Sequence, residues 1–183
     1  DSLNNLSSLT HLTFNTHFNQ PLGDSLKSLT SLTHLTFGYN FNHPLTDLLN
    51  NLTSITHLTL GGKFDQKLGN SLNNLTFLTH LTLGYKFNQS LEIPFNIKIL
   101  TLDCNNINLI ENLPNSIEEL NFGSYFNLEL SNLPNSIKII RFDKESKYNK
   151  NLNNLPKQLE ILELPEKYDK DIVNINPNCK IIK

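Results

Sequence analysis

Leu9-Thr10-His11-Leu12-Thr13-Phe14 is the stretch that decides the fold, because its apolar triplet of Leu9, Leu12 and Phe14 occurs eight times along the chain. Every one of the 24 triplet positions is Leu, Ile or Phe. The residues that open the triplets are Leu9, Leu32, Ile55, Leu78, Ile97, Ile117, Ile137 and Leu159. Their spacings are 23, 23, 23, 19, 20, 20 and 22 residues, and self-similarity at this period is typical of a solenoid.

Each repeat is predicted to contain one short strand. Leu12 and Phe14 are two residues apart and share one face of an extended chain, so His11 and Thr13 share the other face. Stacking the repeats places these strands in a parallel sheet with neighbours about 4.8 Å apart. A single repeat buries too little apolar surface to fold alone, so the repeats depend on their neighbours.

The segments outside the strands differ between the two halves of the chain. The first four repeats carry an extra leucine six residues before the triplet, at Leu3, Leu26, Leu49 and Leu72. The later repeats replace it with Leu-Pro pairs, and proline favours an extended backbone. We therefore predict an α/β-type, right-handed solenoid with a parallel concave β-sheet. It has short helical or 3₁₀ turns on the convex side of its first half and extended segments in its second half.

The whole chain, residues 1–183, is expected to form one repeat solenoid. Longer 23-residue repeats occupy residues 1–93, shorter repeats of 19–22 residues occupy 94–176, and a terminal partial repeat occupies 177–183. Asp1-Ser2-Leu3 matches the mid-repeat sequence Asp24-Ser25-Leu26, and the chain contains no Met. We expect further sequence upstream of residue 1.

Composition narrows the classes of partner and the setting. The net charge of −2 gives no broad basic field, so neither nucleic acid nor an anionic membrane is an expected partner. No apolar run approaches the roughly 20 residues that a membrane span requires. Cys104 and Cys179 lie about four repeats apart, too far for a disulfide, which indicates a reducing, cytoplasmic setting.

An Asn or Asp recurs about ten residues after each triplet opens. It follows an aromatic or apolar residue, as in Phe18-Asn19. We expect this column to form a turn ladder whose side chains bond backbone groups of neighbouring coils. The predicted ladder residues are Asn19, Asn42, Asp65, Asn88, Asn108, Asn127, Asn149 and Asp169.

Two rows of side chains are expected on the open, concave face of the sheet, where a partner would bind. The first row is His11, His34, His57, His80, Ile99, Glu119, Ile139 and Ile161. The second row is Thr13, Thr36, Thr59, Thr82, Thr101, Asn121, Arg141 and Glu163. The histidines form either a binding stripe or a ladder copied by repeat duplication. Adventitious Zn²⁺ or Ni²⁺ binding is a third reading, and no carboxylate or thiol lies among the histidines to support it.

No catalytic constellation is visible. The sequence has no glycine-rich phosphate loop, no metal-spaced Cys/His cluster and no nucleophile motif, so we expect no enzyme, cofactor or metal site. Four glycines recur just after the strands, where a turn requires them, at Gly38, Gly61, Gly84 and Gly123.

The pattern L-x-x-L-x-L is present as Leu9-x-x-Leu12-x-Phe14. A second pattern is present as Phe18-Asn19-Gln20-Pro21-Leu22 and Phe41-Asn42-His43-Pro44-Leu45. By the first pattern the repeats resemble leucine-rich repeats, and by the second, more narrowly, the FNIP-repeat family of social amoebae and of giant viruses that infect amoebae. The resemblance implies a leucine-rich-repeat-like coil. In many viral members an F-box precedes the repeats and recruits a cullin-type ubiquitin ligase.

The first functional hypothesis is a non-enzymatic protein–protein recognition scaffold. By resemblance, it is the substrate-binding part of an F-box adaptor, joined to cullin-ligase components through an N-terminal region outside this sequence. The alternative is a structural component of a viral particle or another assembly, located in the virion and making contacts through solenoid edges. The first hypothesis predicts a monomer and the second an edge-stacked assembly. Ice binding by the threonines is disfavoured because histidine interrupts their face.

Overall fold

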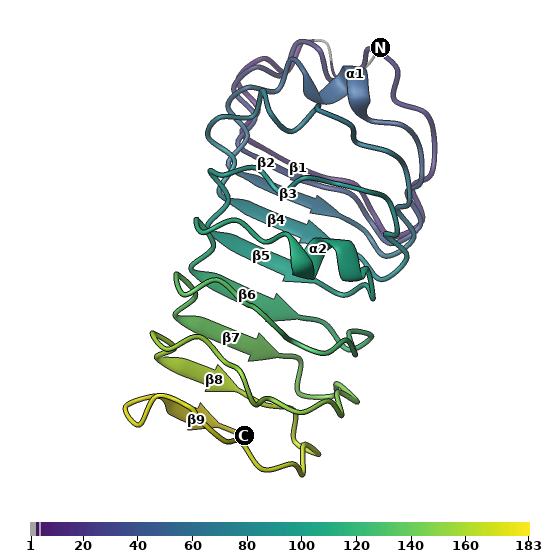
Figure 1. The fold of residues 1–183 in the computed structure, drawn as a ribbon. Coiled ribbons are helices and arrows are strands. Elements are labelled where there is room, and N and C mark those ends of the chain that lie inside the picture. The colour runs from purple at the N-terminus through teal and green to yellow at the C-terminus, as the bar shows by residue number, and fades with distance from the viewer. Residues whose placement is uncertain (1–2, 4) are drawn as a thin grey trace.

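The computed structural model describes residue 3 and residues 5–183, and its coils stack in chain order with the first and last coils at opposite ends (Figure 1). Within these residues, nine short strands form a single parallel sheet along one wall of the stack, in the order β1 to β9. The strands are β1 (His11–Thr13), β2 (His34–Thr36), β3 (His57–Leu60), β4 (His80–Leu83), β5 (Ile99–Leu102), β6 (Glu119–Phe122), β7 (Ile139–Phe142), β8 (Ile161–Glu163) and β9 (Lys180–Ile182). The predicted solenoid with a parallel sheet is therefore confirmed.

The strand register follows the triplets of the sequence. Leu35 pairs with Leu58, and Leu58 with Leu81, so equivalent residues of consecutive coils face each other. These three leucines are at most 1% exposed, whereas the histidines and threonines beside them stay partly exposed. The alternation arises because successive side chains of a strand point to opposite faces. One side of the sheet closes the core, and the other remains open.

Stacked aromatic rings run through the core behind the sheet. Phe41, Phe64 and Phe87 are buried, and their ring centroids lie 6.3 Å apart at both steps. The interplanar angles are 3° and 5°, so each ring lies parallel to the next. Because the same ring occupies the same place in each coil, each coil packs on the flat sides of its two neighbours. Phe41, Phe64 and Phe87 are therefore covered on both ring faces by the coils above and below.

Helical structure is sparse, and half of it lies where extended backbone was expected. Helix α1 (Thr46–Leu49) lies in the first half, as predicted, and buries Leu48 and Leu49. Helix α2 (Ile107–Glu111) lies in the second half and buries Leu109 and Ile110. The prolines of the later repeats do not reach this segment, because Leu113-Pro114 follows the helix. The prediction of extended segments throughout the second half is corrected at α2.

The described residues contain no helix long and apolar enough to cross a membrane. Residues 1, 2 and 4 lie outside the described residues. They include part of Asp1-Ser2-Leu3, which matches a mid-repeat sequence, and part of the start of the predicted 1–183 solenoid.

Candidate functional site: the open face of the sheet

The open face carries two side-chain columns, which we call the histidine column and the threonine column after their first members. Backbone pairing aligns the histidine column as His11, His34, His57, His80, Ile99, Glu119, Ile139, Ile161 and Lys180. The same pairing aligns the threonine column as Thr13, Thr36, Thr59, Thr82, Thr101, Asn121, Arg141, Glu163 and Ile182. All sixteen residues expected on this face therefore lie in two continuous columns. Lys180 and Ile182 extend the columns onto β9.

The four histidines stack face to face. Their ring centroids are 4.1 Å apart from His11 to His34, 4.1 Å from His34 to His57, and 3.8 Å from His57 to His80. The interplanar angles are 12°, 14° and 20°. These separations are shorter than the strand spacing of about 4.8 Å, so the rings lean towards one another. The first half of the column presents the edges of a continuous stack of imidazoles.

The threonine before His34, His57 and His80 indicates which ring nitrogen carries the proton. The Thr33 hydroxyl donates to the carbonyl oxygen of Thr10 at 3.0 Å, and its Oγ1 lies 2.9 Å from Nδ1 of His34. A hydroxyl has one proton to donate, so the contact with the ring places the imidazole proton on Nδ1. The same pair of contacts recurs at Thr56 with His57 and at Thr79 with His80. These three rings leave Nε2 as a hydrogen-bond acceptor.

The charge state of this stack is sensitive to pH. Burial lowers the pKa of His34, His57 and His80 below the usual value. Neighbouring histidines lower the pKa of His34 and His57 further, and Glu119 on β6 opposes the shift at His80. The neutral rings of His34, His57 and His80 are therefore favoured in the folded protein near pH 7.

Acid is expected to destabilise the first four coils. A folded-state pKa below the unfolded value means that the unfolded chain binds more protons, so stability is complete above about pH 6.5 and is lost as the pH falls from there through the lower folded-state pKa. Between pH 8 and pH 5 the Tm should fall by about 2–6 °C. Hydrogen exchange at pH 5 should rise first in β1 to β4. The control is the triple variant His34→Asn, His57→Asn and His80→Asn, whose Tm should stay level. An equal fall in Tm in the parent protein and in the triple variant would contradict the attribution of the acid effect to His34, His57 and His80.

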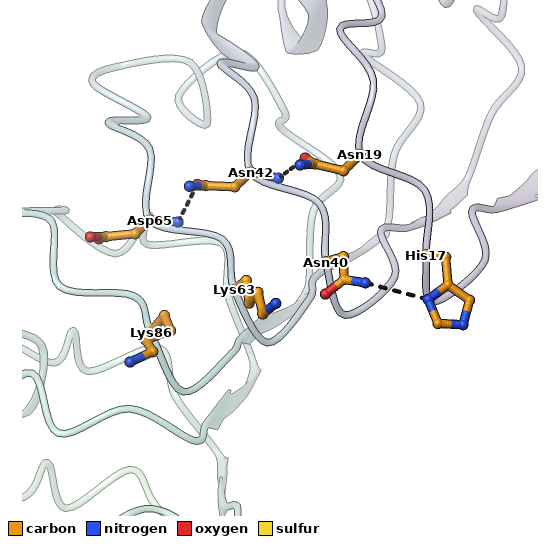
Figure 2. A pocket seen from close by; sticks show the side chains of 7 residues that line it. All are labelled: His17, Asn19, Asn40, Asn42, Lys63, Asp65 and Lys86. Carbon is orange, nitrogen blue, oxygen red and sulfur yellow. Dashed lines mark hydrogen bonds between the residues drawn. The ribbon is translucent and has the colours of Figure 1, made fainter.

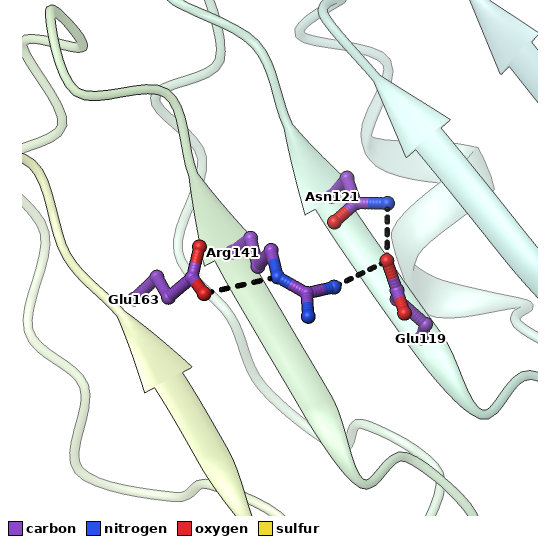
Figure 3. A network of polar contacts seen from close by, with 4 residues as sticks. All are labelled: Glu119, Asn121, Arg141 and Glu163. Atoms are coloured by element: carbon purple, nitrogen blue, oxygen red, sulfur yellow. Dashed lines mark hydrogen bonds and ion pairs between the residues drawn. The ribbon is translucent and has the colours of Figure 1, made fainter. Parts of the chain in front are cut away.

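The second half of the open face is ionic. Arg141 bridges two carboxylates, with Nη1 2.5 Å from Oε1 of Glu119 and Nε 3.1 Å from Oε1 of Glu163 (Figure 3). Asn121 donates to the same Glu119 oxygen at 3.1 Å. The Glu119 hydrogen bond, and then Glu163, raise the pKa of Arg141. The side chains are between 20% and 35% exposed, so this network is half-buried and held in one geometry.

The Asn/Asp column forms a ladder beside the sheet. The backbone N–H of Asn42 donates to Oδ1 of Asn19 at 3.0 Å, and the N–H of Asp65 donates to Oδ1 of Asn42 at 2.9 Å (Figure 2). The N–H of Asn88 donates to Oδ1 of Asp65 at 2.9 Å. Each side chain thus bonds a backbone group of the next coil.

In the fifth coil the side chain that bonds the next coil is that of Asn105, which corrects the prediction of Asn108. The N–H of Asn127 donates to Oδ1 of Asn105 at 2.7 Å, and the N–H of Asn149 donates to Oδ1 of Asn127 at 3.1 Å. Asn108 lies in α2, which begins two residues after the turn and displaces it from the ladder. In the described residues the last of these bonds is the one from the backbone N–H of Asn149 to the side chain of Asn127, and Asp169 is exposed beyond it.

A group of tyrosines that the repeat pattern does not predict lies on the loops that follow the strands. Tyr39, Tyr85 and Tyr125 stack on one another, and Tyr39 and Tyr125 are 42% and 60% exposed. The available signal was their position, since each comes one or two residues after a recurring glycine. Among the described residues, no group of three or more His, Cys, Asp and Glu side chains is placed to hold a metal ion.

Comparison with known proteins agrees with this geometry. The model of the FNIP repeat matches residues 87–125 and 105–145. The structure is similar to CroV588, a circular leucine-rich-repeat protein of a giant virus, with a TM-score of 0.62 and 30% identity over 97% of this chain. The chain spans only 33% of the length of that protein.

The fold is also that of an internalin from Listeria monocytogenes. The TM-score is 0.52 and the identity 15%, over 98% of this chain and 75% of the internalin. The chain has no match among curated proteins.

Proposed function

We propose that this chain, a leucine-rich-repeat-like solenoid that carries FNIP repeats, is a non-enzymatic scaffold that binds a partner protein through the open face of its sheet. The observation that carries the proposal is the pair of continuous columns on nine parallel strands. Repeat scaffolds of this kind use an extended surface for recognition. The open face also changes chemistry along its length, which allows one end of a partner to be distinguished from the other.

The two halves of the face suit different parts of a partner. The Nε2 acceptors of His34, His57 and His80, with the adjacent threonine hydroxyls, match donors such as Lys, Arg or amide side chains. In the second half, Ile139 and Ile161 flank the ionic network of Arg141 and offer apolar contact. Interfaces combine an apolar centre with polar groups around it, and this face provides both.

A finer proposal is that the partner is a substrate delivered to a cullin-type ubiquitin ligase by an F-box outside this sequence. It is supported only by the likeness of the repeats to the FNIP family and to the giant-virus protein CroV588. The chain covers one third of the length of CroV588. We further propose a cytoplasmic setting, because Cys104 and Cys179 are both free thiols. The rival proposal is an assembly component that makes contacts through coil edges.

The test is affinity purification of the tagged protein from its native cells, with mass spectrometry of the bound proteins. Thr59→Arg places a long cation in the middle of the open face and should reduce recovery of the partner at least tenfold. Thr53→Arg is the matched control, because this exposed residue lies in the same coil but outside the sheet. Partner recovery should not change in the control. Equal recovery of the partner by the parent protein, Thr59→Arg and Thr53→Arg contradicts the open-face proposal and favours contacts through coil edges. Cullin subunits among the bound proteins support the adaptor role.

A further inference from the structure

A second exposed surface lies on the loops that follow alternate strands. Tyr39 follows β2, Tyr85 follows β4 and Tyr125 follows β6. The ring centroids of Tyr39 and Tyr85 are 5.8 Å apart, and those of Tyr85 and Tyr125 are 4.8 Å apart. Three aromatic rings therefore run together across five coils. Tyrosine is among the residue types that contribute most to protein interfaces.

The contact between Tyr39 and Tyr85 depends on a glycine in the coil between them. A Cβ atom at Gly62 would lie 2.5 Å from Cδ2 of Tyr39 and 3.2 Å from Cε1 of Tyr85. Tyr39, Gly62 and Tyr85 occupy the same position in three successive coils, so the glycine provides the space in which the rings meet. Duplication of one repeat would place a tyrosine at position 62 as well. Because tyrosine alternates with glycine here, this group of rings differs from the columns in which successive coils carry the same residue.

Hydrogen-bond donors gather at this group of rings. The Tyr39 hydroxyl donates to the Tyr85 hydroxyl at 3.0 Å, which leaves the Tyr85 proton available to a ligand. Nζ of Lys63 lies 5.6 Å from the centroid of the Tyr39 ring, and Nζ of Lys86 lies 5.2 Å from that of Tyr85. Within the part of the chain that the structure describes, neither lysine forms a salt bridge.

The two lysines border a shallow pocket of about 540 Å³, which His17, Asn40 and Asp65 also line (Figure 2). Asp65 is the one carboxylate in the lining. Its Oδ1 accepts hydrogen bonds from the N–H of Asn88 and from Nε2 of Gln89, both at 2.9 Å, so this oxygen is engaged in the ladder. The described lining carries the ammonium groups of Lys63 and Lys86 and the one carboxylate of Asp65. The pocket therefore favours an anion.

We propose that Tyr39, Tyr85, Tyr125, Lys63 and Lys86, the tyrosine–lysine ridge, bind an acidic peptide segment of a partner protein. Carboxylates of the segment accept hydrogen bonds from the Tyr85 hydroxyl and from the ammonium groups of Lys63 and Lys86, and the bonds to the ammonium groups are charge-assisted and hence strong. The apolar part of the segment packs on the exposed faces of Tyr39 and Tyr125. A protein carboxylate is preferred to nucleic acid because the chain as a whole carries a charge of −2.

The ridge is a different surface from the columns of the open face. Its side chains come from the loops after the strands, and none belongs to the histidine or threonine column. The proposal therefore goes beyond the proposed function of the open face, and each can fail without the other. Thr59→Arg should leave binding at the ridge unchanged.

The test is fluorescence anisotropy with a labelled peptide of alternating Glu and Ala, compared with the same peptide in which Gln replaces Glu. At low salt the chain should bind the Glu peptide at least tenfold more tightly than the Gln peptide. The double variant Lys63→Gln and Lys86→Gln should lose this preference. Gly62→Ala, which keeps every ridge residue but separates the rings, should weaken binding at least fivefold with an unchanged Tm. The matched control is Lys157→Gln with Lys170→Gln, which removes the same charge from exposed residues of the last coils and should bind as the parent does.

Three outcomes would overturn the proposal. The Gln peptide could bind as tightly as the Glu peptide, or the control double variant could lose as much affinity as the ridge variant. Tighter binding of a single-stranded oligonucleotide, whose bases also stack on aromatic rings, would reassign the ridge to nucleic acid.

Discussion

Gly61→Ala is expected to destabilise the solenoid by about 3 kcal/mol or more, because the new methyl group collides with the backbone of the preceding coil. A Cβ atom at Gly61 would lie 2.1 Å from the carbonyl oxygen of Gly38 and 2.6 Å from its carbonyl carbon. A side chain can change rotamer to avoid such a contact, whereas the backbone moves only if the coils separate. Urea unfolding followed by circular dichroism would measure the loss as a lower midpoint.

Two other glycines separate the collision from other effects of the substitution. Gly23 has φ of +48° and open space around it, so Gly23→Ala should cost only the strain of a left-handed residue, about 1–2 kcal/mol. Gly62 meets only the rings of Tyr39 and Tyr85, so Gly62→Ala should cost less still. If Gly61→Ala costs no more than Gly23→Ala, the collision between coils is not the reason for glycine at this position.

This result bears on why glycine follows so many strands. The sequence predicted a turn that needs unusual backbone angles. The structure gives another reason, since Gly61 lies outside the left-handed region and sits against the coil before it. Recurrence along the sequence revealed that the position is constrained. The nature of the constraint depends on the neighbouring coil and is visible only in three dimensions.

The strands and their register were predictable because the repeat imposes both. A triplet that returns at a fixed spacing aligns Leu35 with Leu58 and Leu81, and a side-chain period of two then exposes the histidines and threonines. The two columns of the open face follow directly. The tautomers of the rings do not follow, because they depend on hydroxyl contacts such as that of Thr33 with Thr10.

Two features were missed because they depart from the repeat. Helix α2 moved the ladder from Asn108 to Asn105, since the fifth coil folds its turn before the helix begins. The tyrosine–lysine ridge joins residues of alternate coils, Tyr39 with Tyr85, so comparison of adjacent repeats does not reveal it. Departures from the repeat such as these are visible only in the three-dimensional structure, even though the repeat itself is plain in the sequence.

Phe64→Ala is expected to cost about 3–5 kcal/mol and to lower the midpoint of urea unfolding accordingly. Phe64 is 0% exposed and stacks between Phe41 and Phe87, so its removal opens a cavity that contacts both neighbouring coils. The matched control is Phe77→Ala, which removes the same side chain from a position that is 65% exposed. The control should change stability by no more than about 0.5 kcal/mol.

The position of the cavity also predicts how the chain unfolds. Each coil packs mainly on its two neighbours, although Tyr39 and Tyr85 meet across the third coil, so a weak interface in the third coil reduces the coupling between the coils on either side. In Phe64→Ala, hydrogen exchange should therefore rise in β1 and β2 at urea concentrations where β5 to β8 remain protected. If protection is lost from all strands together, the solenoid unfolds as one cooperative unit and the coupling extends beyond nearest neighbours. If Phe64→Ala and Phe77→Ala are equally stable, the stacked rings do not provide the expected stabilisation between coils.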